Sequence, residues 1–62
     1  MYKLMIKDRP KGKLCFTGIR IGGTADRAAA YADGYQAALR GLSYPHRIVV
    51  HDERGEFVYA AR

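Results

Sequence analysis

This chain of 62 residues has one cysteine, no tryptophan, two prolines and no long hydrophobic run. The single cysteine excludes an internal disulfide and a cysteine-clustered zinc site, and it suits the reducing cytoplasm, where we expect the protein. No run approaches the roughly 18 apolar residues of a membrane helix, and the apolar stretch after Met1 is too short for a signal peptide. We therefore expect no membrane partner, and the length predicts a single domain over residues 1–62.

Acidic residues are also scarce: the chain has six Asp and Glu and eleven Lys and Arg, which gives a net charge of +5. The whole excess falls in residues 1–23, where Asp8 is the only acid among six basic side chains: Lys3, Lys7, Arg9, Lys11, Lys13 and Arg20. Such a one-sided field attracts polyanions or acidic protein surfaces. Alternatively, the lysines keep an edge hairpin soluble and prevent strand pairing with neighbours.

Alternating apolar residues predict a strand over residues 2–7, followed by a turn over residues 8–12 and a second strand over 13–21. In the second strand the alternation breaks at Gly18. We expect a β-bulge of one extra residue at Thr17–Gly18. That bulge would bring four apolar side chains to one face of the sheet: Leu14, Phe16, Ile19 and Ile21.

The alanine-rich segment from Ala25 to Arg40 predicts a helix with Thr24 as its N-cap. Its apolar stripe is expected to consist of Ala28, Ala32, Tyr35, Leu39 and Leu42, with Asp26, Asp33 and Arg40 on the opposite side. Gly34 is expected where the helix lies close to a strand. Gly41 is expected to end the helix in the left-handed conformation, with Leu42 closing over it.

Two more strands are predicted over residues 47–51 and from Glu56 to Ala60, joined by a turn at residues 52–55 with Gly55 in the left-handed position. The order indicates the α+β class, as a β-β-α-β-β domain whose antiparallel four-stranded sheet carries one helix on one face. The other face would be uncovered. It should carry every second residue of the last strand, which includes Phe57 or Tyr59. Seven further side chains should lie on it: Lys3, Met5, Lys7, Cys15, Arg47, Val49 and His51.

The chain offers little for catalysis, so we expect no enzyme and no catalytic, cofactor or metal site. The glycine-rich segment 18–24 lacks the spacing of a phosphate loop. His46 and His51 would lie on opposite faces of their strand and share no metal. Cys15 is expected to be an ordinary, partly buried thiol.

Two resemblances concern layout. The stretch from Gly23–Thr24 through the alanines to Leu39 resembles the helix of HicB-type antitoxins, which also follows antiparallel strands, over less than a third of the chain. In size and organisation the chain is similar to small phage proteins that block host transcription or defence machinery. This second resemblance implies an inhibitor of nucleic-acid-handling proteins, with no diagnostic residue to carry over.

We therefore hypothesise a non-catalytic protein-binding module, an inhibitor or adaptor, that recognises an acidic protein surface. The alternative is direct nucleic-acid binding, because a basic sheet face with Tyr or Phe can stack bases. A third hypothesis is a homodimer through the open sheet face. The expected partner-binding residues are Lys3, Lys7, Arg9, Lys11, Lys13, Tyr44, Arg47 and His51.

Overall fold

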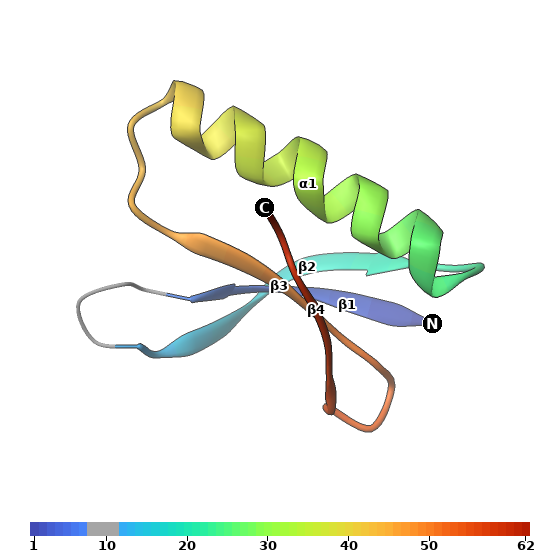
Figure 1. Ribbon diagram of the computed structural model, residues 1–62. Helices are drawn as coiled ribbons and strands as arrows, with labels where there is room; N and C mark the ends of the chain where they lie inside the picture. The colour runs from blue at the N-terminus through green and yellow to red at the C-terminus, as the bar shows by residue number, and fades with distance from the viewer. Residues whose placement is uncertain (8–11) are drawn as a thin grey trace.

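The chain forms one antiparallel sheet with a single helix packed across one face (Figure 1). The computed structural model describes residues 1–7 and 12–62. The elements in chain order are β1 (Tyr2–Lys7), β2 (Leu14–Ile21), α1 (Ala25–Gly41), β3 (Arg47–His51) and β4 (Phe57–Ala60). The predicted α+β class and element order are confirmed. Most of the predicted turn at residues 8–12 lies outside the described residues, but Gly12 has the positive φ expected there, at 65°.

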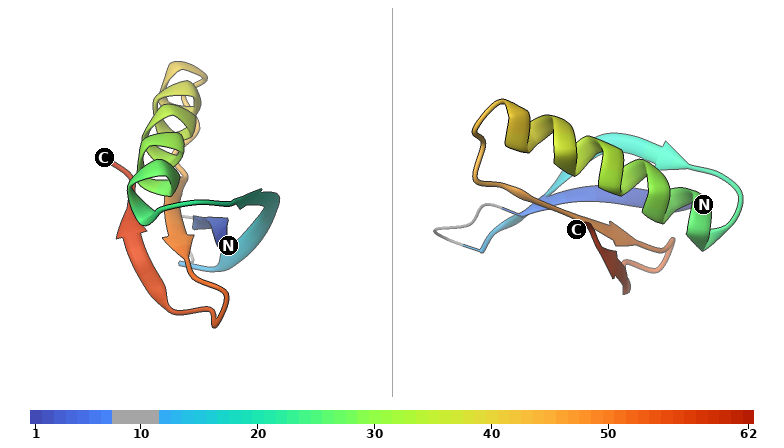
Figure 2. Two further views of the ribbon diagram at one scale, coloured as in Figure 1. Left: turned by 90° about the vertical axis from the view of Figure 1, so that its right-hand side faces the viewer. Right: turned by 45° about the horizontal axis from the view of Figure 1, so that its top comes forward.

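The strand order β2-β1-β3-β4 puts β1 and β3 in the centre of the sheet (Figure 2). Each hairpin therefore contributes one inner and one edge strand. In the β1–β3 pairing, Lys3 lies opposite His51 and Lys7 lies opposite Arg47. Residues from the two ends of the chain thus meet in the middle of the sheet.

The core lies between α1 and the sheet. Leu4, Ile48 and Val50 are fully buried and meet Ala28 and Ala32 of the helix, which are also fully buried. Alanines on this stripe let the helix backbone approach the strands closely. Tyr35 and Leu39 pack against the same core as predicted, whereas Leu42 does not.

Gln36 continues the buried stripe of the helix and is 3% exposed. Its side-chain Nε2 donates to the carbonyl of His46 at 2.9 Å, and its Oε1 accepts from the amide of Ile48 at 2.8 Å. A side-chain amide offers the same donor and acceptor as a peptide unit. Gln36 therefore satisfies two backbone groups at the start of β3 and joins this strand to α1.

The end of the chain returns to the helix, as Figure 1 shows. Asp33 accepts hydrogen bonds from the Tyr59 hydroxyl at 2.9 Å and from the Arg62 amide at 3.0 Å. Asp33 was predicted on the solvent side of the helix, and this is wrong because its carboxylate reaches over the flank of α1 to β4. The Arg62 amide and then the Tyr59 hydroxyl hold the pKa of Asp33 below its ordinary value.

The Asp33 contact predicts a pH-dependent contribution to stability. Because the pKa of Asp33 is lower in the folded chain than in the unfolded one, its contribution is present above about pH 4 and is lost as the pH falls through the folded value. Asp33→Asn should therefore lower the melting temperature at pH 7. In a series of thermal melts the gap between the parent and the variant should close as the pH falls through the lowered pKa of Asp33. An equal gap at both pH values would contradict the role assigned to this carboxylate.

The helix ends one residue later than the sequence indicated, and its left-handed residue comes two residues later. Gly41 is the last helical residue, and the left-handed conformation falls on Ser43, with φ 62°. The amide of Ser43 donates to the Arg40 carbonyl and that of Tyr44 to the Leu39 carbonyl, both at 3.0 Å. These two bonds form a Schellman motif with Ser43 at its left-handed position. The predictions for Gly41 and Leu42 are wrong, and Leu42 is 67% exposed.

Gly34 lies on the exposed side of α1, which contradicts the predicted contact with a strand. A Cβ placed on Gly34 would meet nothing within 4 Å. The glycine therefore only weakens the helix. Gly34→Ala should stabilise the protein by about 1 kcal/mol, which raises the melting temperature by roughly 4–8 °C in a domain of this size. Thermal unfolding followed by circular dichroism measures this, and an unchanged melting temperature would refute it.

Candidate binding face of the sheet

The sheet has one face away from α1, and strand register determines which side chains it carries. Cross-strand partners in a sheet point to the same side. Because Leu4, Ile48 and Val50 pack against the helix, their neighbours in β1 and β3 point away from it. We call this set the open face: Lys3, Met5, Lys7, Leu14, Phe16, Arg20, Arg47, Val49, His51, Phe57 and Ala60.

The open face consists of three rows that run across the strands. The central row is apolar and contains Phe16, Met5, Val49 and Ala60. One flanking row contains Arg20, Lys3, His51 and Phe57, and the other contains Leu14, Lys7 and Arg47. An apolar strip thus lies between two rows that carry the cations.

A larger bulge than predicted brings Phe16 to this face. Between the Lys3–Arg20 and Met5–Phe16 pairs, β1 has one residue and β2 has three. The Thr17 hydroxyl donates to the Leu4 carbonyl at 2.7 Å, and Gly18 takes a φ of 88°. The bulge lies where it was predicted, but it contains two extra residues. The alternation of β2 therefore continues across it, and Phe16 points to the same face as Arg20.

Three placements are corrected by this bulge. Leu14 and Phe16 do not join Ile19 and Ile21 over the core but lie on the open face, 42% and 43% exposed. Cys15 pairs with Ile6, so it does not belong to the open face, where it was expected. Nor is Cys15 partly buried, because its side chain is exposed at the edge strand.

A second irregularity, in β4, determines which of its two aromatic residues, Phe57 or Tyr59, lies on the open face. Val50 pairs with Tyr59 and His51 with Phe57, so Val58 is an extra residue in this strand. Val58 and Tyr59 pack against the core, whereas Phe57 is on the open face and 64% exposed. The open face therefore carries two exposed phenylalanine rings, one on each edge strand.

Phe16 lies among cations. The Nζ of Lys3 is 5.9 Å from the centre of the Phe16 ring, and the guanidinium carbon of Arg20 is 5.4 Å from it. Both distances fall within the range of cation–π contacts. These contacts hold two positive charges beside a ring that solvent reaches.

Like charges lie opposite each other twice on the open face. Lys3 is the cross-strand partner of Arg20, and Lys7 that of Arg47. Within the four described strands, every Lys and Arg belongs to the open face and Asp and Glu are absent. Like charges directly opposite one another destabilise a sheet. The Arg47 guanidinium is held by a hydrogen bond that it donates to the Ala61 carbonyl at 2.9 Å.

The need to keep edge strands from pairing with other chains does not account for most of the cations on the open face. Lys3 and Lys7 lie on β1 and Arg47 on β3, which are the two inner strands. A charge that prevents edge-to-edge pairing is needed on an edge strand. Only Arg20, on β2, meets this condition among the four cations of the open face.

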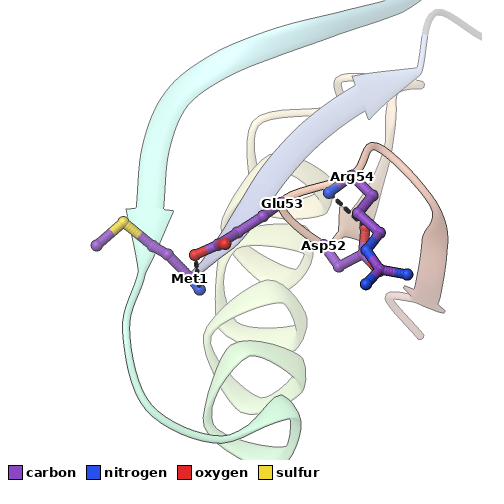
Figure 3. A network of polar contacts seen from close by, with 4 residues as sticks. All are labelled: Met1, Asp52, Glu53 and Arg54. Carbon is purple, nitrogen blue, oxygen red and sulfur yellow. Dashed lines mark hydrogen bonds and ion pairs between the residues drawn. The ribbon is translucent and has the colours of Figure 1, made fainter.

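At one end of the open face, a network of polar contacts joins β1 to the β3–β4 loop (Figure 3). The amino group of Met1 pairs with Glu53 at 2.6 Å, and this lowers the pKa of Glu53. Both groups are more than half exposed, so the pair adds little stability. Asp52 accepts from the amides of Glu56 and Arg54, both at 2.9 Å, and the predicted turn closes with Gly55 at φ 82°.

The expected partner-binding residues are only partly brought together. Lys3, Lys7, Arg47 and His51 share the open face, whereas Lys13 is exposed just before β2. Arg9 and Lys11 lie outside the described residues. Sequence reasoning missed Leu14, Phe16 and Arg20 as members of the face and left Phe57 as an alternative to Tyr59.

Tyr44 does not belong to the open face. It follows the end of α1, is 53% exposed, and its ring centre is 6.0 Å from that of His46. Together with Gln36 and Arg40 it lines a hollow of about 80 Å³ beside the start of β3. Pockets that enclose small ligands are larger, about 300–1,000 Å³.

In residues 1–7 and 12–62, no three His, Cys, Asp or Glu side chains gather where they could hold a metal ion. Nor does the described part of the chain contain a helix long and apolar enough to cross a membrane. No protein-family model, curated protein or solved structure matches this chain.

Proposed function

We propose that the protein binds single-stranded nucleic acid on its open face. The observation that carries this proposal is the combination of two exposed rings, Phe16 and Phe57, with four cations on a sheet face whose strands contain no Asp or Glu. Aromatic rings stack unpaired bases, and Lys and Arg contact the phosphates between them. A duplex keeps its bases stacked inside, so this combination favours single strands.

The positions of the cations and rings favour nucleic-acid binding over binding to an acidic protein surface. An acidic protein surface would also be attracted by Lys3, Lys7, Arg20 and Arg47. The placement of Phe16 beside two of these cations matches a nucleotide more closely, because a nucleotide joins a flat ring to a phosphate. Binding to an acidic protein is therefore the competing outcome of the test below.

A homodimer through the open face is disfavoured by charge. Two copies packed face to face would bring four cations of one chain against four of the other. The strands that form the face contain no Asp or Glu, and the carboxylate at its end, Glu53, is already paired with the Met1 amino group. Burying such unpaired charges costs far more than the apolar row would return.

The proposal is tested by fluorescence anisotropy with labelled 12-nucleotide DNA and RNA strands and the corresponding duplexes. Single strands should bind more tightly than duplexes. The logarithm of the affinity should fall linearly with the logarithm of the salt concentration, by about 0.7 per phosphate contacted. Lys7→Gln should reduce this slope by about 0.7, because it removes one contact.

The matched control is Arg27→Gln, which removes the same charge from an exposed residue of α1. It should leave the slope unchanged. If neither single strand binds at low salt, the proposal fails, and a pull-down from nuclease-treated lysate becomes the test of the acidic-protein hypothesis. Equal slopes for Lys7→Gln and the parent would contradict the assignment of phosphate contacts to the open face.

A further inference from the structure

We infer that Phe16 and Phe57 stack two non-adjacent bases of one strand, so that the shortest ligand that uses both rings has four nucleotides. This inference rests on the proposed function and adds the length and path of the bound strand. The two rings belong to the opposite edge strands β2 and β4. They also belong to neighbouring rows of the open face.

The separation of the rings follows from the register. Three strand-to-strand steps of about 4.8 Å separate β2 from β4, and neighbouring rows are two residues, or about 7 Å, apart along a strand. The diagonal between the two positions is therefore about 16 Å. Stacked bases of one strand rise by about 3.4 Å per nucleotide, and an extended strand reaches about twice that. Bases one or two positions apart reach only about 7 and 14 Å and cannot span 16 Å, whereas bases three positions apart can.

The path between the rings crosses the centre of the sheet. On this path a strand passes over Met5, which is half-buried, and Val49, which is 6% exposed. Neither offers a ring, so the two intervening nucleotides have no stacking partner there. Their phosphates pass between Lys3 in one flanking row and Lys7 in the other.

The two rings are not equivalent. Phe16 has Lys3 and Arg20 within 6 Å of its centre, which gives it a base platform with phosphate contacts beside it. Phe57 is paired across the strands with His51 and is the more exposed ring. A short ligand should therefore occupy Phe16 first and reach Phe57 only when it is long enough.

The test is a length series of oligothymidylates of two, three, four and six nucleotides, titrated against the parent, Phe16→Ala and Phe57→Ala. For the parent, affinity should rise at least tenfold between two and four nucleotides, because a stacked base contributes that much. Either alanine variant should lose this step. Tyr31→Ala, which removes an exposed ring from α1, should keep it.

An independent readout uses the absence of tryptophan from the chain. In Phe57→Trp the single indole reports stacking by fluorescence quenching, and the quenching should appear with four nucleotides but not with two. In Phe16→Trp it should already appear with two. Circular dichroism of each variant confirms that the fold is retained.

The failures of the two proposals are distinguishable. If six nucleotides fail to bind the parent, the proposed function itself fails. If they bind but Phe57→Ala keeps the tenfold step, the binding is real and the two-ring path is wrong. Quenching at residue 57 by two nucleotides would likewise overturn the assigned order of occupation.

Discussion

Replacing Gln36 by leucine should be among the most destabilising substitutions in the helix, although leucine is a better helix former and of similar size. The change removes the partners of the Ile48 amide and the His46 carbonyl, both at the junction of α1 and β3. A buried backbone group without a partner costs roughly 1–3 kcal/mol. We expect a loss of about 2–4 kcal/mol, a large share of the stability of a small domain. Urea unfolding followed by circular dichroism measures it.

The Gln36→Glu variant separates hydrogen bonding from packing. A protonated glutamic acid can replace both bonds, whereas a carboxylate cannot donate to the His46 carbonyl. Burial raises the pKa of such a group above its unfolded value, so the variant should be most stable below about pH 4 and should lose stability as the pH rises. Ala30→Leu, at an exposed position of α1, is the control and should change stability by under about 0.5 kcal/mol. A leucine variant as stable as the parent would show that the amide bridge contributes nothing.

Lys7→Glu should change stability and binding in opposite directions. Lys7 lies directly opposite Arg47, so the substitution turns a repulsive cross-strand pair into an attractive one. We expect a gain of about 0.5–1 kcal/mol in the free energy of unfolding. The same change removes a phosphate contact and adds repulsion, so affinity for a single strand should fall about tenfold or more in 0.1 M salt. Thermal melts and anisotropy titrations on one preparation measure both.

Arg27→Glu is the matched control, because it lowers the net charge by the same two units from the first turn of α1. A carboxylate is favourable near a helix N-terminus, so the fold should be retained. Its affinity should stay within about threefold of the parent, since only long-range attraction is reduced. If Lys7→Glu bound as tightly as Arg27→Glu, the open face would not be the nucleic-acid site. If Lys7→Glu lost stability, the repulsion between Lys7 and Arg47 would be refuted.

The elements of the fold could be predicted from local patterns, but the details of their ends could not. Alternation over residues 2–7 and the alanines after Thr24 identify a strand and a helix because each pattern reflects one buried face. The order of strands in the sheet depends on contacts between distant segments, which no local pattern encodes. Gly41 was preferred as the left-handed residue for its permissive backbone, but the chain continues the helix for one residue and bends at Ser43.

Only part of the open face could be predicted, because local alternation does not reveal the size of a bulge. Lys3, Lys7, Arg47 and His51 follow simple alternation and were placed correctly. Phe16 was misplaced because an extra residue in a bulge reverses parity and two extra residues restore it, and sequence spacing does not distinguish the two. Gln36 had a signal that was overlooked, since it continues the spacing of four set by Ala28 and Ala32.

The central position of β1 and β3 has a consequence for how the chain is made. On a ribosome, β1 and β2 are synthesised before β3, so one edge of β1 has no partner strand until residues 47–51 have been added. Until then only β1 and β2, which are half of the sheet, are present to contact the helix. The core between α1 and the sheet includes Ile48 and Val50, so it can close only after β3 has been made.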